Sequence, residues 1–230
     1  MTSPSDIDVI VFDVLGTMVD EPSGIRRGIR TLLPDVDDAR TEELLAVWQR
    51  HVEEQQQEML AGSRPFASST VIDAEAAAVV AAAAGTSDPA SVQALAASAR
   101  RLEPWPDAVG ALDRIASRFP VVGLSNASQS ALTTINAHAG LRWHQALSAE
   151  AARRYKPHPD VYRLAISNTG RPPERILMVA AHAWDLRGAQ AVGMRTAYVE
   201  RPVGDPPSAT DAFDLSTKSL DELATVLGSP

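Results

Sequence analysis

The stretch Asp8-Val9-Ile10-Val11-Phe12-Asp13-Val14-Leu15-Gly16-Thr17 decides the fold of this chain. Its apolar, β-branched run is typical of a buried strand, and Gly16 lets the backbone turn sharply after it. Asp13 then lies at the C-terminal end of the strand, where open parallel sheets bind their ligands. We take Asp13 as the first candidate for chemistry. From this stretch alone, an Asp that only caps the turn after a strand is an equally good interpretation.

Composition and charge limit the classes of protein that fit the chain. Its 230 residues suffice for one α/β unit that carries an insertion. Lys and Arg number 21 against 29 Asp and Glu, a net charge of −8, and no basic cluster stands out, so we expect no nucleic-acid partner. The chain has no cysteine, which excludes disulfides, thiolate metal sites and a cysteine nucleophile.

The sequence shows no targeting or membrane-spanning segment. Residues 1 to 8 carry acids where a signal peptide has a basic region, and no run of 18 apolar residues occurs. We therefore expect a cytoplasmic protein without a membrane partner.

Helical spacing dominates for about 90 residues after Thr17. We predict helices over Glu42–Leu60, over Asp73–Ala84, and from Ser87-Asp88-Pro89 to about Leu102. Their small and apolar side chains suit close helix packing, so the segment is predicted to form a helical bundle.

Strands and helices alternate from Glu103 onward. We predict helices over 107–119, 128–139 and 186–192, a last helix that Ser219-Leu220-Asp221-Glu222 opens, and strands over 121–124, 176–180 and 195–199. Such alternation with short loops indicates a parallel sheet with helices on its faces, an α/β fold. We therefore expect residues 1–17 and 104–230 to form one α/β core domain and residues 18–103 to form a helical domain inserted above the first strand.

Polar residues follow the predicted strands in a fixed order. Ser125 and Asn126 end the second strand, and Asp185 follows the third. Lys156 lies between them in the loop Tyr155-Lys156-Pro157-His158-Pro159. Singly, Ser, Asn and Asp at these points are ordinary helix caps and a Lys beside Pro is ordinary surface. Together with Asp13 they form a constellation at one edge of the sheet.

This constellation resembles the haloacid dehalogenase superfamily, and the resemblance covers nearly all of the chain. Asp-Val-Leu-Gly-Thr at 13–17, Ser-Asn-Ala-Ser at 125–128, Tyr-Lys-Pro-His-Pro-Asp-Val-Tyr at 155–162 and His-Ala-Trp-Asp at 182–185 match its four motifs. The last three are most similar to the type II L-2-haloacid dehalogenases. The resemblance implies a Rossmann-like parallel core with an inserted helical cap.

The residue two positions after Asp13 separates the branches of the superfamily. Phosphatases carry a second Asp there to protonate the leaving alcohol, whereas this chain has Leu15. Proton delivery is worth roughly 10²- to 10⁴-fold, and a halide, already a stable anion, does not need it. Leu15 therefore argues against phosphomonoester hydrolysis and permits carbon–halogen displacement.

The resemblance also implies roles for the site residues. Asp13 would be the nucleophile that forms an ester with the substrate. Lys156 would offset the negative charge, and Asp185 would pair with Lys156 and orient water. Hydrogen bonds from Thr17, Ser125 and Asn126 would hold Asp13 and the substrate carboxylate, and Tyr162 would lie close by. No metal or cofactor is expected, and the family is commonly dimeric, so a homodimer is possible.

Several positions depart from the family pattern. The arginine that receives the halide in type II enzymes directly follows the tryptophan of the first cap helix, but Gln49 follows Trp48 here and Arg50 comes one residue later. One residue on a helix is about 100° of rotation. His182 stands in place of an asparagine, and Leu15 in place of an aromatic residue. Leu15, Gln49, Arg50, His182 and Trp184 are the candidate pocket residues beside Tyr162.

Three functions are open at this stage. The first is hydrolysis of a small 2-halocarboxylic acid to a 2-hydroxy acid. The second is a hydrolase of the same fold on a phosphorylated or other small substrate, with Mg²⁺ held by Asp13, the carbonyl of Leu15 and Asp185. The third is a catalytically inactive binding or regulatory protein.

Overall fold

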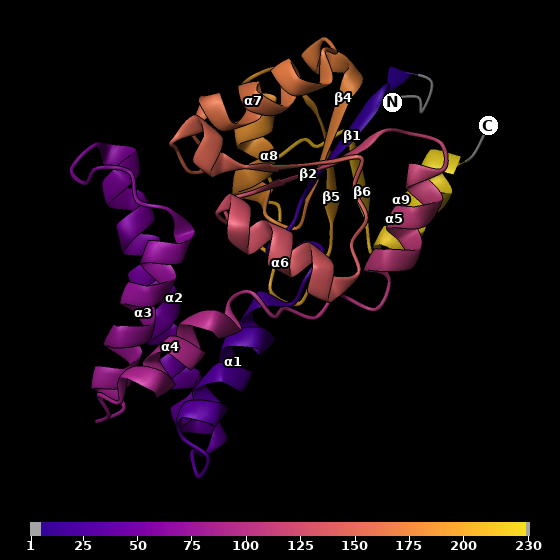
Figure 1. Cartoon of the computed structure of the whole chain (residues 1–230). Helices are drawn as coiled ribbons and strands as arrows, with labels where there is room; N and C mark the ends of the chain where they lie inside the picture. Colours follow the sequence, from indigo (N-terminus) through magenta and orange to yellow (C-terminus); the bar gives the residue numbers. More distant parts are fainter. Residues whose placement is uncertain (1–5, 229–230) are drawn as a thin grey trace.

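The described part of the chain, residues 6–228 of a computed structural model, is organised around one six-stranded parallel sheet (Figure 1). Residues 1–5 lie outside the described residues, and with them most of the segment from which we expect no signal peptide. The strands are β1 (Val9–Asp13), β2 (Val121–Ser125), β3 (Gln145–Ser148), β4 (Ile176–Ala180), β5 (Arg195–Val199) and β6 (Leu215–Thr217). Their order, β3-β2-β1-β4-β5-β6, reverses on the two sides of β1. The C-terminal end of β1 is therefore the point where such sheets bind ligands.

The strands that the sequence predicts lie mostly in the middle of the sheet, where both faces are covered. Every residue of β1, β2 and β4 is buried, which explains their continuous apolar runs. The strands predicted over 176–180 and 195–199 are confirmed to the residue, and β2 extends one residue past its predicted end. The strands β3 and β6 were not predicted. Both lie at edges of the sheet and are only partly buried.

Helices cover both faces of the sheet, as the alternating pattern predicts. On one face α5 (Ala108–Ala116), α6 (Gln129–Ala139) and α9 (Leu220–Gly228) share an apolar cluster with Ile10 and Phe12 of β1. On the other face α7 (Pro159–Thr169) and α8 (Ala183–Gln190) pack on Val9 and Val11. Alternate residues of β1 thus pack into the apolar clusters on opposite faces of the sheet. We refer to the sheet with α5–α9 as the sheet core.

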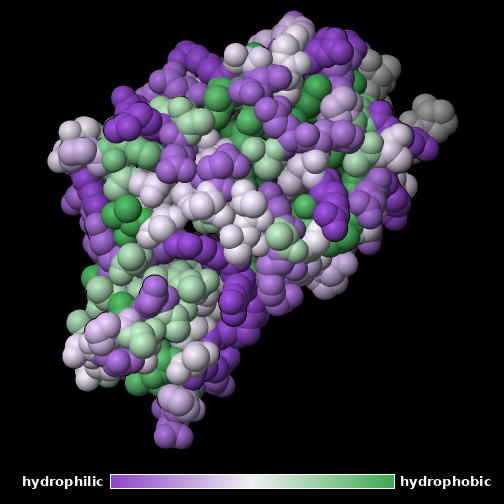
Figure 2. Space-filling model, viewed as in Figure 1, coloured by the Kyte–Doolittle hydropathy of each residue, from purple (hydrophilic) through white to green (hydrophobic). Residues whose placement is uncertain are grey.

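Four helices between β1 and α5 pack against one another. They are α1 (Glu21–Leu32), α2 (Asp38–Ala61), α3 (Ser69–Ala83) and α4 (Pro89–Ser98), and we call them the helical lobe, residues 21–98. Their shared cluster includes Ile25, Leu44, Trp48 and Val80. Figure 1 shows this lobe projecting from one end of the sheet core, and Figure 2 shows pale and green, more apolar side chains gathered on it.

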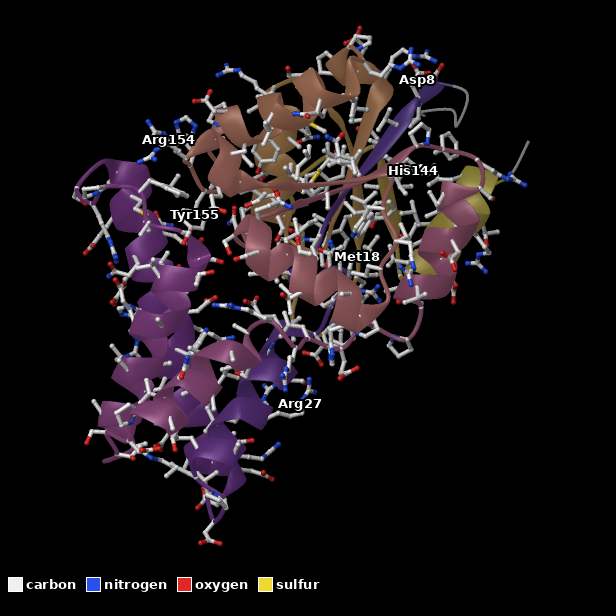
Figure 3. The ribbon with its side chains drawn as sticks, in the orientation of Figure 1. Asp8, Met18, Arg27, His144, Arg154 and Tyr155 are labelled. Atoms are coloured by element: carbon white, nitrogen blue, oxygen red, sulfur yellow. The ribbon has the colours of Figure 1, made fainter. Side chains whose placement is uncertain are left out.

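The helical lobe joins the sheet core at its base and at points farther along. At its base, Val19 bridges Pro104, and the N–H of Asp20 donates to the carbonyl of Glu103 at 2.9 Å. Farther along, the Tyr155 hydroxyl of the core donates to the carbonyl of Ala67 at 3.0 Å. Figure 3 shows Tyr155 beside the far end of α2 and α3. The space between these two contacts is where the pocket described below opens.

Within residues 6–228, no helix combines the length and apolar character that crossing a bilayer requires.

Candidate active site

Two buried carboxylates share one buried ammonium group at the C-terminal edge of the sheet. Lys156 Nζ donates to Asp13 Oδ1 at 2.9 Å and to Asp185 Oδ2 at 2.8 Å. The side chains of Lys156 and Asp185 are 1% and 0% exposed, and that of Asp13 is 8% exposed. Asp13 ends β1, and Asp185 lies in the first turn of α8 behind β4, so adjacent parallel strands bring them together.

The turn after β1 fixes the second oxygen of Asp13. The Thr17 hydroxyl donates to Asp13 Oδ2 at 2.7 Å and accepts the N–H of Ala181 at 2.9 Å. Gly16 makes this turn with a φ of 77°, a left-handed conformation that glycine adopts most easily. A Cβ atom at Gly16 would stand 2.5 Å from Nε2 of His182. Both oxygens of Asp13 are thus held by hydrogen bonds from residues of the predicted motifs.

The residues that end β2 hold the lysine loop in place. The side-chain oxygen of Asn126 accepts the backbone N–H of Lys156 at 2.9 Å. The hydroxyl of Ser125 accepts the N–H of Ala127 at 3.1 Å and is fully buried. Asn126 therefore positions the backbone of Lys156, and Ser125 stabilises the turn into α6.

Tyr162 of α7 completes the hydrogen bonding of Asp185. Its hydroxyl donates to Asp185 Oδ1 at 2.7 Å, so Asp185 receives bonds from both Tyr162 and Lys156. Burial and the adjacent carboxylate of Asp185 raise the pKa of Tyr162, which keeps the phenol protonated and donating.

Burial and the neighbouring carboxylates shift the pKa of Lys156 in opposite directions. Burial lowers the pKa of Lys156, but the charges of Asp13 and Asp185 outweigh it, and the net pKa lies above the ordinary value. Burial raises the pKa of Asp185, the charge of Asp13 adds to this rise, and Lys156 opposes it. The lysine is therefore held as a cation between two acids.

A pocket of about 590 Å³ opens above this group, between the sheet core and the helical lobe. From the core it is lined by Asp13, Leu15, Asn126, Lys156, Pro157, His182 and Trp184; from the lobe by Glu21, Pro22, Ile25, Leu45, Trp48, Gln49, Val52, Glu53, Gln56, Gln57 and Leu60. Figure 2 shows the surface hollowed where the two parts meet. The volume suits a small molecule.

The pocket brings together most of the candidate residues. Leu15, Gln49, His182 and Trp184 line it, and the rings of His182 and Trp184 stack at 5.7 Å. Arg50 is exposed and does not line it. Thr17, Ser125, Tyr162 and Asp185 lie behind the lining, each buried and bonded as described above.

Two acids of the helical lobe were not among the predicted site residues. Burial raises the pKa of Glu21 to about 7; the charge of His182 opposes this rise and that of Asp13 adds to it. Burial and the charge of Glu21 raise the pKa of Asp73 to about 8, against the charge of Arg100. The only signal for either residue in the sequence is a position near a helix start, which solvated acids share.

The Mg²⁺ alternative names Asp13, the carbonyl of Leu15 and Asp185 as ligands. The position between the carboxylates of Asp13 and Asp185 is taken by Nζ of Lys156, which bonds to both. Across residues 6–228, no group of three or more His, Asp or Glu side chains is placed to hold a metal ion. The cation bound by the carboxylates of Asp13 and Asp185 is the ammonium group of Lys156.

The fold and this buried lysine–carboxylate group define a class of hydrolase. A model of the haloacid dehalogenase-like hydrolase family matches residues 7–193, and the chain belongs to this family. The predicted α/β fold and the predicted family are therefore both confirmed.

Several haloacid dehalogenases are similar to this chain over almost its whole length. An (S)-2-haloacid dehalogenase 4A of Burkholderia cepacia is 30% identical over 225 residues, covering 94% of this chain and 93% of the relative. The structure of a defluorinating L-2-haloacid dehalogenase superposes with a TM-score of 0.89 at 28% identity, covering 100% of this chain and 99% of the other. That of an L-2-haloacid dehalogenase of Xanthobacter autotrophicus with covalently bound chloropropionic acid gives 0.84 at 26% identity, covering 97% and 100%.

Proposed function

We propose that this hydrolase displaces halide from a small 2-halocarboxylic acid and forms a 2-hydroxy acid through an ester of Asp13. The observation that supports it most directly is the Lys156 ammonium, bonded to both Asp13 and Asp185 at the floor of the pocket. The names of the relatives, (S)- and L-2-haloacid dehalogenases, support the same substrate class.

In the first step, a carboxylate oxygen of Asp13 forms a bond to carbon 2 of the substrate, and the carbon–halogen bond breaks. The bonding pair leaves with the halide, so no proton is required, consistent with Leu15 in place of a second acid. Attack from the side opposite the halogen inverts carbon 2. The covalently bound chloropropionic acid in the Xanthobacter autotrophicus relative supports an ester intermediate.

In the second step, water attacks the carboxyl carbon of the Asp13 ester. The ammonium of Lys156, 2.9 Å from Asp13 in the free site, offsets the negative charge that develops on the ester. Asp185, which Tyr162 and Lys156 hold in place, accepts a proton from the water. The carbon–oxygen bond of the ester then breaks, and the proton on Asp185 passes to the leaving alkoxide, which departs as the hydroxy acid. Asp13 loses its remaining proton to solvent and is a carboxylate again.

The halide would be received by pocket N–H groups rather than by an arginine. Gln49, His182 and Trp184 line the pocket and carry N–H groups, whereas Arg50 lies outside its lining. A halide accepts hydrogen bonds from such donors, although each is weaker than one from a cation.

We propose that the helical lobe forms the main part of a cap domain, residues 18–103, on a core of residues 1–17 and 104–230. The pocket lining supports this division, because it comes from both parts. The metal-independent reaction, the homodimer and the cytoplasmic location stay predictions.

Single-turnover hydrolysis of 2-chloropropionate in ¹⁸O-water, with enzyme in excess and no added metal, tests the mechanism. We expect halide release, with label first in the Asp13 carboxylate, located by mass spectrometry of peptides, and product that takes its new oxygen from the protein. Asp13→Asn should release no halide, with Asp20→Asn, an acid outside the pocket lining, as control. Label that enters the product directly would overturn the ester, and magnesium-dependent phosphate release would favour the alternative hydrolase.

A further inference from the structure

A second cavity lies where the far end of the helical lobe meets the sheet core. Its volume is about 250 Å³, and Leu60 is the residue that its lining shares with the larger pocket. The lobe contributes the end of α2 and the loop behind it, and the core contributes Arg153, Arg154, Tyr155 and His158. Figure 3 shows Arg154 and Tyr155 at this junction, beside the far end of α2 and α3. A ligand in this cavity would therefore touch both parts of the molecule.

The charged side chains that line this cavity are all basic. They are Arg64, Arg153, Arg154 and His158, and no Asp or Glu belongs to the lining that residues 6–228 provide. The whole chain has a net charge of −8, and the larger pocket has acids in its lining. Positive charge concentrated in a hollow of an acidic protein attracts anions.

Two of these cations have no acidic partner among the described residues. The guanidinium of Arg154 donates to the carbonyl of Arg153 at 3.0 Å. That of Arg153 lies 5.8 Å from the centre of the Phe66 ring. Both arginines are exposed, so their N–H groups are available to a ligand.

The other two basic residues of the lining are already paired. Arg64 forms an ion pair with Glu75 at 2.7 Å, and Nδ1 of His158 lies 3.6 Å from a carboxylate oxygen of Asp160. The unpaired positive charge at the cavity therefore comes from the two adjacent arginines, and it matches an anion with two negative charges.

The backbone at Arg153 is in an uncommon conformation. Its φ of 49° and ψ of 41° are left-handed, and within residues 6–228 it is the one residue other than glycine with a positive φ. Residues with a Cβ atom are strained there. Such strain tends to occur where a side chain has a function to perform. Here it accompanies a guanidinium that lies over the ring of Phe66.

Apolar and aromatic side chains form the remaining wall of the cavity. Met59, Phe66 and Tyr155 pack in one cluster, and the ring centres of Phe66 and Tyr155 are 5.5 Å apart. Guanidinium groups bind phosphate oxygens in pairs, and an aromatic ring offers a face to an organic group. The combination suits an organic molecule that carries a phosphoryl group.

We propose that this cavity is a second ligand site, which binds the phosphoryl group of a small organic phosphate on Arg153 and Arg154. A phosphate monoester carries about −1.5 to −2 charges at pH 7, which matches the two unpaired guanidinium groups. The organic part of the ligand contacts Phe66 of the lobe while the core holds the phosphoryl group, so the ligand ties the two parts together. Binding there does not require the proposed dehalogenation to occur.

Isothermal titration calorimetry with phenylphosphonate tests the site. This compound has a ring and a phosphoryl group but no ester bond for a phosphatase to cleave, and it is titrated at about pH 8, where the phosphoryl group is doubly ionised. Inorganic phosphate, which lacks the ring, and benzoate, which has one charge, are titrated in parallel. The proteins are wild type, Arg153→Gln, Arg154→Gln and the matched control Arg142→Gln, which removes an exposed arginine between α6 and β3 outside this lining.

We expect wild type to bind one phenylphosphonate per chain. Its dissociation constant should rise about ten-fold or more in Arg153→Gln and in Arg154→Gln, the effect of one charged hydrogen bond, whereas Arg142→Gln should bind like wild type. Inorganic phosphate and benzoate should each bind more weakly than phenylphosphonate. Bound phenylphosphonate should also slow hydrogen exchange in residues 62–68 of wild type, the loop that lies against Tyr155.

Each contrary result would overturn a stated part of the proposal. Phenylphosphonate binding that Arg153→Gln and Arg154→Gln leave unchanged would place the anion elsewhere, and an equal loss in Arg142→Gln would show general charge attraction; either result, or no binding at all, would overturn the site. Inorganic phosphate that binds as tightly as phenylphosphonate would overturn the organic ligand in favour of free phosphate. Unchanged hydrogen exchange in residues 62–68 would overturn the link between lobe and core.

Discussion

At the scale of single residues, the site depends on one lysine that bonds to two buried acids. Removing charges from water is costly, and the cost is met only when partners and hydrogen bonds are complete. Lys156 bonds to both carboxylates, and Thr17 and Tyr162 supply the remaining bonds. The same cation thus stabilises the fold and, in the proposed reaction, offsets the charge of Asp13.

Lys156→Met should abolish halide release and lower the free energy of unfolding by about 3–5 kcal/mol near pH 8. The pKa of Asp185 is already raised by burial, and loss of the ammonium raises it further. A carboxyl whose pKa rises on folding costs stability only where it is ionised, so the loss should shrink toward pH 5.

Urea unfolding of wild type and variant at both pH values measures this difference. Lys218→Met, which removes an exposed lysine far along the chain, is the control and should change stability little. A loss that is the same at the two pH values would contradict this explanation, since it would not arise from the buried carboxylates.

The sequence alone indicated those site residues that stand beside a recognisable sequence pattern. Asp13 and Asp185 follow apolar runs, and Lys156 stands beside a proline that precedes a helix. Glu21 and Asp73 have no such mark, because acids near a helix start are usually solvated. Only the packing of α1 and α3 against the sheet core turns them toward buried space.

At the scale of elements, the turn after β1 connects Asp13, the proposed nucleophile, to the pocket wall. Its backbone places Gly16 against the ring of His182 and carries Thr17 back toward Asp13. The indole N–H of Trp105 donates to the Gly16 carbonyl at 3.0 Å and fixes the same turn from the other side. The turn therefore has little freedom to move without disturbing the site.

Gly16→Ala should lower kcat/KM for halide release by at least about ten-fold and also reduce stability. The new Cβ adds the cost of a left-handed alanine, about 1–2 kcal/mol, and stands 2.5 Å from His182 Nε2. Gly85→Ala is the matched control, because Gly85 has a φ of 76° and a methyl group added there would have no atom within 4 Å. Kinetics and urea unfolding of both variants separate the effect of backbone strain, which the two share, from that of the contact with His182, which only Gly16→Ala makes.

The control variant should lose stability and keep its activity. If Gly85→Ala impaired halide release as much as Gly16→Ala, the effect would come from general loss of stability rather than from displacement of His182. The contact between Gly16 and the histidine would then have no catalytic consequence.

The elements that the sequence did not reveal lie at the borders of the sheet. The central strands are buried on both faces and are recognisable as continuous apolar runs. Gln145–Ser148 and Leu215–Thr217 are short edge strands in which Gln145 and Ser216 are exposed. Their pairing depends on a neighbour already in place, which no local pattern records.

At the scale of the whole molecule, the pocket exists because the helical lobe meets the sheet core at both ends of a gap. The base is the backbone pairing of Asp20 with Glu103. The far contact is made by Tyr155, and between them the Ser128 hydroxyl lies 2.8 Å from that of Thr70. These polar contacts and the apolar packing of Tyr155 join the two parts, so we expect the width of the pocket to depend on them.

Tyr155→Phe should loosen the far contact without disturbing the core of either part. Tyr155 is buried among Met59 and Ile72 of the lobe, and its hydroxyl donates to the Ala67 carbonyl at 3.0 Å. Loss of that bond should lower the free energy of unfolding by about 1 kcal/mol. It should also speed hydrogen exchange in residues 62–68 and raise KM several-fold, because a wider pocket holds substrate less firmly. Tyr198→Phe is the matched control, since Tyr198 is a buried tyrosine of β5 within the sheet core. We expect the control to leave exchange in residues 62–68 and KM unchanged. Equal behaviour of the two variants would mean that the lobe is held by its apolar contacts alone and that the hydroxyl of Tyr155 does not set the width of the pocket.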